Sequence, residues 1–225
     1  MEMKEYNWRF SKENIKGFDK HIKSSVPYYD IFHQSLASVS KFFARRGSEI
    51  IDVGTSTGNF IHLLKNNIHR DCSFIGIDVE EGMIEECQKR YNREIDFLHI
   101  DCVDFDYSNA SVVGLVLVLQ FIDKHKRIKF LEQLYRELKE DSVLLIIERV
   151  RSDNPVMNDV FNDLYYDFKM EMGLTEKEIL NKNLSLRGVM KPLTLKENFE
   201  MLNNIGFKTE ICAKFNNFAS MVAIK

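Results

Sequence analysis

The feature that most constrains this chain is an alternation, from Glu49 to about residue 150, of short apolar runs with longer stretches whose apolar residues follow a helical period. That alternation is typical of βαβ units, in which helices connect parallel strands. The fourth apolar run, VVGLVLVL, has no polar face, which predicts a central strand covered by helices on both sides. The predicted strands comprise residues 50–53, 74–78, 97–100, 112–119 and 143–147.

Segments with other patterns flank this alternation. Residues 1–47 are predicted to form helices, the second of which begins near Ser25 and Pro27, because proline in a first helical turn lacks only an N–H group that would be unsatisfied anyway. Residues 151–193 predict a helical insertion that acts as a lid or an interface, with a capping box at residues 175–178.

The C-terminal part predicts one more helix and two strands. A second capping box, at residues 194–197, opens the helix, and Gly206 ends it. The two strands are joined by a tight turn at Asn216 and Asn217 and therefore form an antiparallel pair. The segments together predict one α/β domain over residues 1–225.

The composition limits the classes of function. With 225 residues, of which 44% are hydrophobic, the chain is long enough for one substantial core. A net charge of -3 provides no general attraction to a phosphate backbone, so direct binding of nucleic acid is not expected. The cysteines form no C-x-x-C pair and the histidines show no paired spacing, so no metal site is predicted. The N-terminus lacks an apolar signal core and no apolar run approaches about 18 residues, which predicts a cytoplasmic protein without a membrane segment.

The most informative local sequence is DVGTSTG, at residues 52–58, which follows the first predicted strand. Its glycines allow a sharp turn and a close approach of a ligand to the main chain, although glycines in such turns are often purely structural. The second strand ends in Asp78, which could accept hydrogen bonds from two ribose hydroxyls or, alternatively, cap the following helix. The third strand ends near Asp101 and Cys102, whose carboxylate and backbone N–H could meet an adenine ring.

These elements lie at the carboxyl ends of three successive parallel strands, which is where such sheets bind nucleotides. NAD fits poorly, because the spacing G-x-G-x-x-G that seats a pyrophosphate is missing from this turn. S-adenosylmethionine has no phosphate groups and suits a loop built from Thr55, Ser56 and Thr57. It is therefore the predicted cofactor.

Short motifs along the chain add a family resemblance. They comprise Trp8 with Phe10, Phe18, residues 25–29, 109–111, 119–121 and 167–169, Val189 with Met190, residues 213–217 and residues 220–223. In these motifs the chain resembles the carboxy-S-adenosylmethionine synthase family. The resemblance implies a Rossmann-like class I methyltransferase fold with a seven-stranded sheet and an antiparallel C-terminal strand pair, assembled as a homodimer. Members of that family make the carboxymethyl donor for a tRNA wobble uridine from prephenate and S-adenosylmethionine.

The resemblance also implies which residues contact the cofactor: Tyr29, Gly54, Thr55, Ser56, Asp78, Val79, Asp101, Cys102 and the position of Val116. Two positions depart from the family pattern. Val116 stands where the family has asparagine, and Asn183 stands where the family has the arginine that holds the extra carboxylate. A desolvated carboxylate needs a cation or several strong donors, whereas asparagine supplies only neutral ones. Arg187, four residues after Asn183, could replace the lost charge if the two share a helix face.

These departures favour a methyltransferase that uses unmodified S-adenosylmethionine and transfers the methyl group to an unidentified small-molecule acceptor. The alternative is a carboxy-S-adenosylmethionine synthase that uses prephenate, with Arg187 in place of the missing arginine. A non-catalytic protein that binds S-adenosylmethionine is a third class, because no indispensable catalytic residue stands out.

The catalytic candidates are Glu148, at the end of the fifth predicted strand, and Tyr166 and Asp167, in the insertion. Each has a structural alternative, respectively an ion pair, core packing and a charge on a helix surface. The candidates for substrate binding are Tyr29, Tyr165, Asn183 and Arg187. The Tyr29 ring could face the sulfonium in a cation–π contact or simply pack within its helix.

Overall fold

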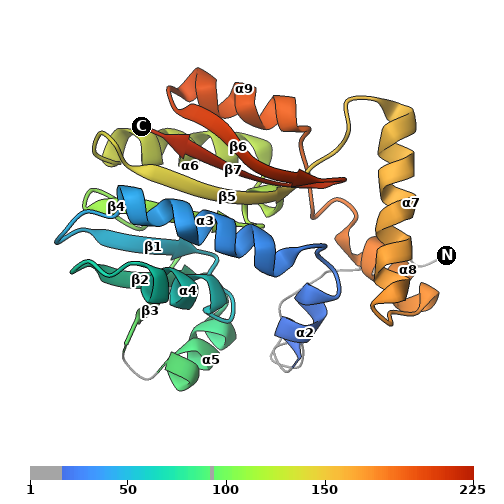
Figure 1. Cartoon of the computed structure of the whole chain (residues 1–225), viewed down its shortest axis with the longest axis horizontal. Helices are drawn as coiled ribbons and strands as arrows, with labels where there is room; N and C mark the ends of the chain where they lie inside the picture. Colours follow the sequence, from blue (N-terminus) through green and yellow to red (C-terminus); the bar gives the residue numbers. More distant parts are fainter. Residues whose placement is uncertain (1–16, 92–93) are drawn as a thin grey trace.

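The structure of the chain is a computed structural model that describes residues 17–91 and 94–225. Its centre is one seven-stranded sheet with the strand order β3-β2-β1-β4-β5-β7-β6 (Figure 1). Strands β1 to β5 run parallel, and β7 pairs antiparallel with both β5 and β6. The strands are β1 (Glu49–Val53), β2 (Ser73–Asp78), β3 (Asp96–His99), β4 (Ala110–Val116), β5 (Val143–Arg149), β6 (Lys208–Phe215) and β7 (Phe218–Ile224).

This sheet confirms the predicted Rossmann-like fold with an antiparallel C-terminal pair. The motif at Trp8 and Phe10 lies outside the described residues. The helices are α2 (Phe18–Lys23), α3 (Tyr29–Phe43), α4 (Asn59–Asn67), α5 (Glu81–Tyr91), the 3₁₀ helix η1 (Leu119–Phe121), α6 (Lys124–Glu137), α7 (Pro155–Glu171), α8 (Glu176–Leu186) and α9 (Leu195–Ile205).

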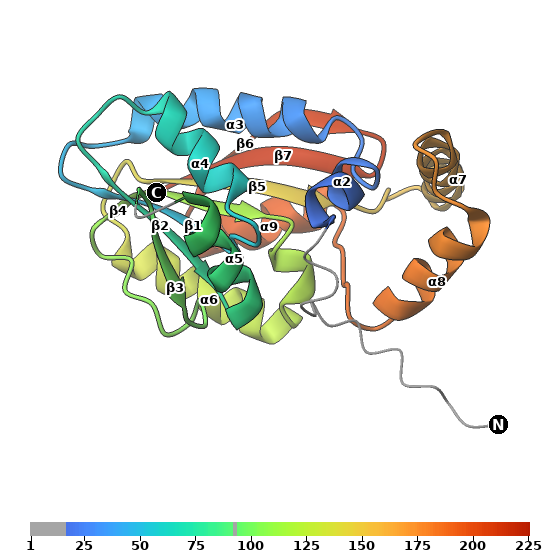
Figure 2. The ribbon, with the colours of Figure 1, turned by 90° about the horizontal axis from the view of Figure 1, so that it is seen from below.

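Helices cover both faces of the sheet. Helices α3 and α4 lie over one face, and α6 and α9 lie over the other (Figure 2). Alternate residues of each central strand therefore enter two different cores: Ile50 of β1 packs with the α3 side, and Ile51 packs with the α6 side. Both side chains are fully buried, as expected for a strand that helices cover on both faces.

The segment predicted as a strand over residues 112–119 ends earlier, at Val116. Leu117 adopts a left-handed conformation with φ 58°, and the chain then enters η1. The reason is a contact distant in sequence: a carboxylate oxygen of Glu148 accepts a hydrogen bond from the backbone N–H of Leu119 at 2.9 Å. The apolar pattern of the run continues through this bend, so periodicity alone could not locate the end of the strand.

The helical segments follow the predictions with one exception. Both capping boxes are present, at residues 175–178 and 194–197, and Gly206 ends α9. Helix α3, in contrast, begins at Tyr29 after a left-handed Tyr28, so the start predicted near Ser25 and Pro27 is wrong. Helices α7 and α8 form the predicted insertion and project from the end of the sheet (Figure 1).

Candidate functional site

The turn after β1 brings the main chain close to the loop that follows β4. Gly54 has φ 62°, and a Cβ atom at this position would lie 2.8 Å from a methyl group of Val118. A side chain there would meet both steric strain and a clash. Ser56 is also left-handed, with φ 53°. The backbone of residues 54–56 thus lies close to the loop after β4, and these two segments form a narrow cradle.

Asp78, at the end of β2, joins this turn to the next loop. One carboxylate oxygen accepts the backbone N–H of Ser56 at 2.9 Å, and the other accepts that of Glu80 at 3.0 Å. The side chain is buried, and desolvation raises its pKa even though these backbone hydrogen bonds favour the charged form. The contact with Glu80 precedes α5, so the structural role considered for Asp78 is present. Each oxygen keeps a second lone pair, and ribose binding remains a proposal.

The other predicted cofactor contacts lie beside Asp78. Val79 is 57% exposed at the same strand end. Asp101 is exposed and accepts the backbone N–H of Val103 at 3.2 Å, while Cys102 is half-buried. The backbone N–H of Ile100 donates to the carbonyl oxygen of Asp78, which places the ends of β2 and β3 side by side.

A second carboxylate, Asp52, lies beneath the glycine turn. Its Oδ2 atom accepts the hydroxyl of Thr55 at 2.8 Å, and only 2% of the residue is exposed. Burial raises the pKa of Asp52 to about 7, and the Thr55 hydrogen bond only partly offsets the effect. The carboxylate supports the turn from inside.

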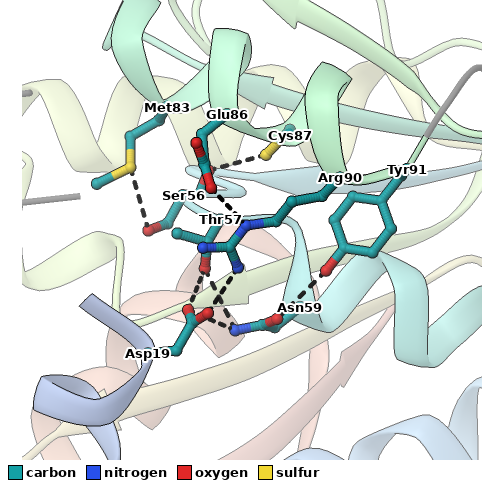
Figure 3. A network of polar contacts seen from close by, with 9 residues as sticks. All are labelled: Asp19, Ser56, Thr57, Asn59, Met83, Glu86, Cys87, Arg90 and Tyr91. Atoms are coloured by element: carbon teal, nitrogen blue, oxygen red, sulfur yellow. Dashed lines mark hydrogen bonds and ion pairs between the residues drawn. The ribbon is translucent and has the colours of Figure 1, made fainter. Parts of the chain in front are cut away.

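Sequence reasoning did not find the residue that fastens α2 to this turn. Asp19 accepts hydrogen bonds from the hydroxyl of Thr57 at 2.6 Å and from the amide of Asn59 at 2.8 Å, and it pairs with Arg90 at 2.6 Å (Figure 3). Burial opposes ionisation of Asp19, but the hydrogen bonds from Thr57 and Arg90 outweigh it and lower its pKa. Helix α2 is therefore held against the start of α4 by a charged residue on its first turn.

The same network braces the turn from the α5 side. Arg90 also pairs with Glu86 at 2.8 Å, and the thiol of Cys87 donates to the carbonyl oxygen of Ser56 at 3.0 Å (Figure 3). The hydroxyl of Ser56 points toward the sulfur of Met83 at 3.8 Å. The turn is thus fixed by neighbours on α2 and α5.

Tyr29 and Asp167, which come from distant parts of the sequence, line one cavity of about 750 Å³ between α3, α7 and the turn joining β6 and β7. Tyr29 also lines a neighbouring cavity of about 350 Å³. Its ring lies 4.0 Å from that of His33 between centroids, and burial raises the pKa of its hydroxyl. The packing role considered for Tyr29 is therefore present alongside its exposure to both cavities.

Glu148 lies away from these cavities. It is 2% exposed, contacts the backbone at the start of η1, and has a pKa of about 8, raised by burial and partly offset by the buried Arg127. This environment fits the positioning of a loop. Val116, at the end of β4, is half-buried.

The insertion separates the remaining candidates. The amide of Asn183 on α8 donates to the hydroxyl of Tyr166 on α7 at 2.7 Å. Arg187 is exposed and follows the last residue of α8, so it does not continue the helix face of Asn183. Tyr165 is buried, and its ring contacts two cations, Arg149 and Lys169.

Comparison with known proteins identifies the family. Residues 50–141 match a methyltransferase domain model. A carboxy-S-adenosyl-L-methionine synthase of Staphylococcus epidermidis is 34% identical over 223 residues, which cover 98% of each chain. Another of the same name, from Nautilia profundicola, is 35% identical over 226 residues, covering 98% of this chain and 96% of its own. The chain belongs to the carboxy-S-adenosyl-L-methionine synthase family.

Solved structures agree with the fold of this family. The plantazolicin methyltransferase BpumL, solved with a triazolic desmethylPZN analog and SAH, has a TM-score of 0.69 and 16% identity, covering 95% of this chain and 90% of its own. A SAM-dependent methyltransferase of Aquifex aeolicus has a TM-score of 0.62 and 16% identity, covering 96% and 99%. The prediction of an S-adenosylmethionine-dependent transferase is confirmed, and the non-catalytic class is not supported.

In residues 17–91 and 94–225, no group of three or more His, Cys, Asp or Glu side chains could hold a metal ion. Among the same residues, no helix has the length and apolar character needed to cross a membrane.

Proposed function

We propose that the chain is a carboxy-S-adenosylmethionine synthase that uses prephenate, which is the alternative weighed above against simple methyl transfer. The observation that carries the proposal is the similarity of the chain, over 98% of its length, to proteins of that name. In addition, β5 ends in a cation, Arg149. A carboxylated substrate needs such a charge, whereas a neutral methyl acceptor does not.

The proposed reaction balances without another reactant. Prephenate loses its ring carboxyl as carbon dioxide and its ring hydroxyl as hydroxide, which leaves phenylpyruvate. The hydroxide takes the proton that the S-methyl group gives up, forming water, and the methyl carbon bonds to the carbon dioxide. S-adenosylmethionine supplies an acidified methyl group next to its sulfonium. The protein holds both partners together and keeps bulk water from the carbon dioxide.

The residues proposed for the cofactor are the backbone of Gly54 to Ser56, the carboxylate of Asp78 and the pair Asp101 and Cys102. Asp78 would accept from the ribose, and Asp101 would accept from the adenine amino group. The fit is supported by the cradle at Gly54, where a Cβ atom would close the space against Val118. Tyr29, which lines both neighbouring cavities, would lie near the reacting end of the cofactor.

The test is to incubate the purified full chain with S-adenosylmethionine and prephenate and to analyse the products by mass spectrometry. The expected products are phenylpyruvate and a species heavier than S-adenosylmethionine by one carbon dioxide unit. A reaction without prephenate is the control. Absence of both products, together with S-adenosylhomocysteine formed in a mixture of small metabolites, would contradict the proposal.

Methyl transfer to a small molecule is the second candidate, and one observation favours it. Asn183, which replaces the family arginine, is exposed and neutral and bonds only to Tyr166 among the described residues. The same mass analysis separates the two candidates, because methyl transfer consumes S-adenosylmethionine without producing phenylpyruvate.

We also propose that α7 lies in a homodimer interface. It exposes a row of apolar side chains to solvent: Val156, Met157, Val160 and Leu164. Exposed apolar rows of this kind mark association surfaces. A molecular mass measured by light scattering at twice the chain mass would support the dimer, and a monomer at micromolar concentration would contradict it. A cytoplasmic location remains a prediction from the sequence.

A further inference from the structure

Two cations share one aromatic ring where the insertion meets the sheet. The ammonium of Lys169 lies 4.2 Å from the centroid of the Tyr165 ring, and the guanidinium carbon of Arg149 lies 4.6 Å from it. Tyr165 is 7% exposed and Lys169 is 6% exposed. A ring face attracts a cation, but it does not neutralise the charge.

No carboxylate compensates these charges among the described residues. The ion pairs there include neither Lys169 nor Arg149, and the guanidinium donates to the neutral side chain of Asn162 at 3.0 Å. Burial, with a smaller contribution from Arg149, lowers the pKa of Lys169 to about 8. Burial, with smaller contributions from Lys182 and Lys169, also lowers the pKa of His21, although the nearby Glu178 acts in the opposite direction. Lys169 and Arg149 thus lie together without an ion-paired carboxylate among the described residues.

A neutral donor without a partner lies on the adjoining turn. Asn217 is 4% exposed, and neither its amide nitrogen nor its amide oxygen forms a hydrogen bond among the described residues. It precedes Phe218, whose ring packs 5.5 Å from that of Tyr165 and whose backbone pairs with Arg149. Buried polar groups without partners are rare, and the amide of Asn217 is able to bond to a water or a ligand.

These residues are linked to the loop after β4, which packs against the turn at Gly54. The backbone N–H of Arg149 donates to the side chain of Gln120 in η1, four residues after the end of β4 at Val116. Helix α2 connects the two regions directly, because Asp19 contacts Thr57 while His21 faces the cations. A ligand bound to both regions would therefore place a carboxylate on one side and an adenosyl group on the other.

We propose that Arg149 and Lys169, stacked on Tyr165 and assisted by Asn217, form a carboxylate-binding subsite that does the work of the arginine replaced by Asn183. The inference rests on the proposed synthase function, since its ligand is the carboxylate of prephenate or the carboxylate of the carboxylated product. Because Tyr165 and Lys169 are buried, access requires the insertion to move from the sheet edge, which is the lid role predicted for residues 151–193.

The test uses Lys169→Met, which keeps the aliphatic stem and removes the charge, with Lys169→Arg to restore it. Calorimetry gives the affinity for carboxy-S-adenosylmethionine relative to S-adenosylmethionine, and steady-state kinetics give the KM for prephenate. We expect Lys169→Met to reduce that preference or raise that KM roughly tenfold, and Lys169→Arg to recover most of the loss. A change in the preference alone would identify the carboxylate of the product as the ligand of the subsite. A change in KM alone would identify the carboxylate of prephenate. The matched control is Lys214→Met, which removes another lysine that lies over a ring of α7, Phe161.

A stability measurement distinguishes binding from structure. If Lys169 serves a ligand, Lys169→Met relieves an uncompensated charge, so the Tm of the protein without ligand should stay equal or rise. A lower Tm with unchanged preference and KM would overturn the subsite, because it would make the stack purely structural. If the wild-type chain forms no carboxylated product, the synthase proposal fails by itself. The subsite then fails too if carboxy-S-adenosylmethionine and S-adenosylmethionine bind equally well to wild type.

Discussion

The turn after β1 (residues 54–58) and the helical insertion differ in how their buried charged groups are compensated. Around the turn, Asp52, Asp78 and Asp19 all have hydrogen-bond donors from the chain itself. In the insertion, Lys169 and the adjoining Arg149 lie over a ring with no carboxylate among the described residues. A site whose polar groups are hydrogen-bonded within the chain is already organised before its ligand arrives, whereas a site with surplus charge gains most of its stabilisation from the ligand. The first region is thus a preformed cradle, and the second depends on its ligand.

The largest expected effect tests whether the carboxylate of Asp78 binds S-adenosylmethionine. Asp78→Ala should weaken binding of S-adenosylmethionine by about 1.5 to 3 kcal/mol, since a charged acceptor of two hydroxyls is lost. Calorimetry measures this change. Asp71→Ala, which removes an exposed carboxylate on the surface, is the control. Unchanged affinity in Asp78→Ala would leave Asp78 with only its loop-joining role.

The next effect concerns pH. Burial raises the pKa of Asp52 from 3.8 to about 7, so the folded state keeps a proton that the unfolded state loses between these values. Stability should therefore fall as pH rises from 5 to 7, at most by on the order of 1 kcal/mol per pH unit from this residue. Urea unfolding at several pH values measures the slope. Asp52→Asn still accepts the Thr55 hydroxyl, and the slope should flatten. An identical slope in the variant would assign the pH dependence to other groups.

A smaller effect is expected at the contact between α2 and the turn. Asp19→Ala should lower the free energy of unfolding by about 0.5 to 1 kcal/mol, because its ion pair with Arg90 is partly exposed and screened. Binding of S-adenosylmethionine should weaken in parallel, since Thr57 and Asn59 lose their common acceptor. Thermal unfolding and calorimetry on the same variant measure both. Asp30→Ala, which breaks the exposed pair with Lys23 on the neighbouring helix, should change neither by as much.

The smallest effect separates the two ways of replacing the family arginine. Arg187→Ala should alter affinity for carboxy-S-adenosylmethionine by less than about 0.5 kcal/mol, because Arg187 is exposed beyond the end of α8. A calorimetric titration of the variant beside wild type measures it. A tenfold loss of affinity would assign carboxylate binding to Arg187 instead of Arg149 and Lys169.

The sheet was predictable from the sequence because burial on both faces produces apolar runs, as in β1 and β5. The turn after β1 was predictable because glycine spacing is a local signal, whereas cofactor binding by this turn stays a prediction. The end of β4 was not, since it depends on Glu148, 29 residues after Leu119. The contacts of Asp19 and the stacking of Arg149 and Lys169 on Tyr165 were missed for the same reason. They involve residues that are distant in sequence, and periodicity carries no information about such contacts.

The position of β7 has a consequence for how the chain acquires its structure. This strand, the last in sequence order, is inserted between β5 and β6, and six of its seven residues are buried. Until it is synthesised, β5 has an unpaired and almost wholly apolar edge, so the nascent sheet is open to pairing with other chains. Vectorial synthesis on the ribosome can build β1 to β5 in order, but closure of the sheet must wait for residues 218–224. The folding rate should then be limited by this late, long-range strand insertion.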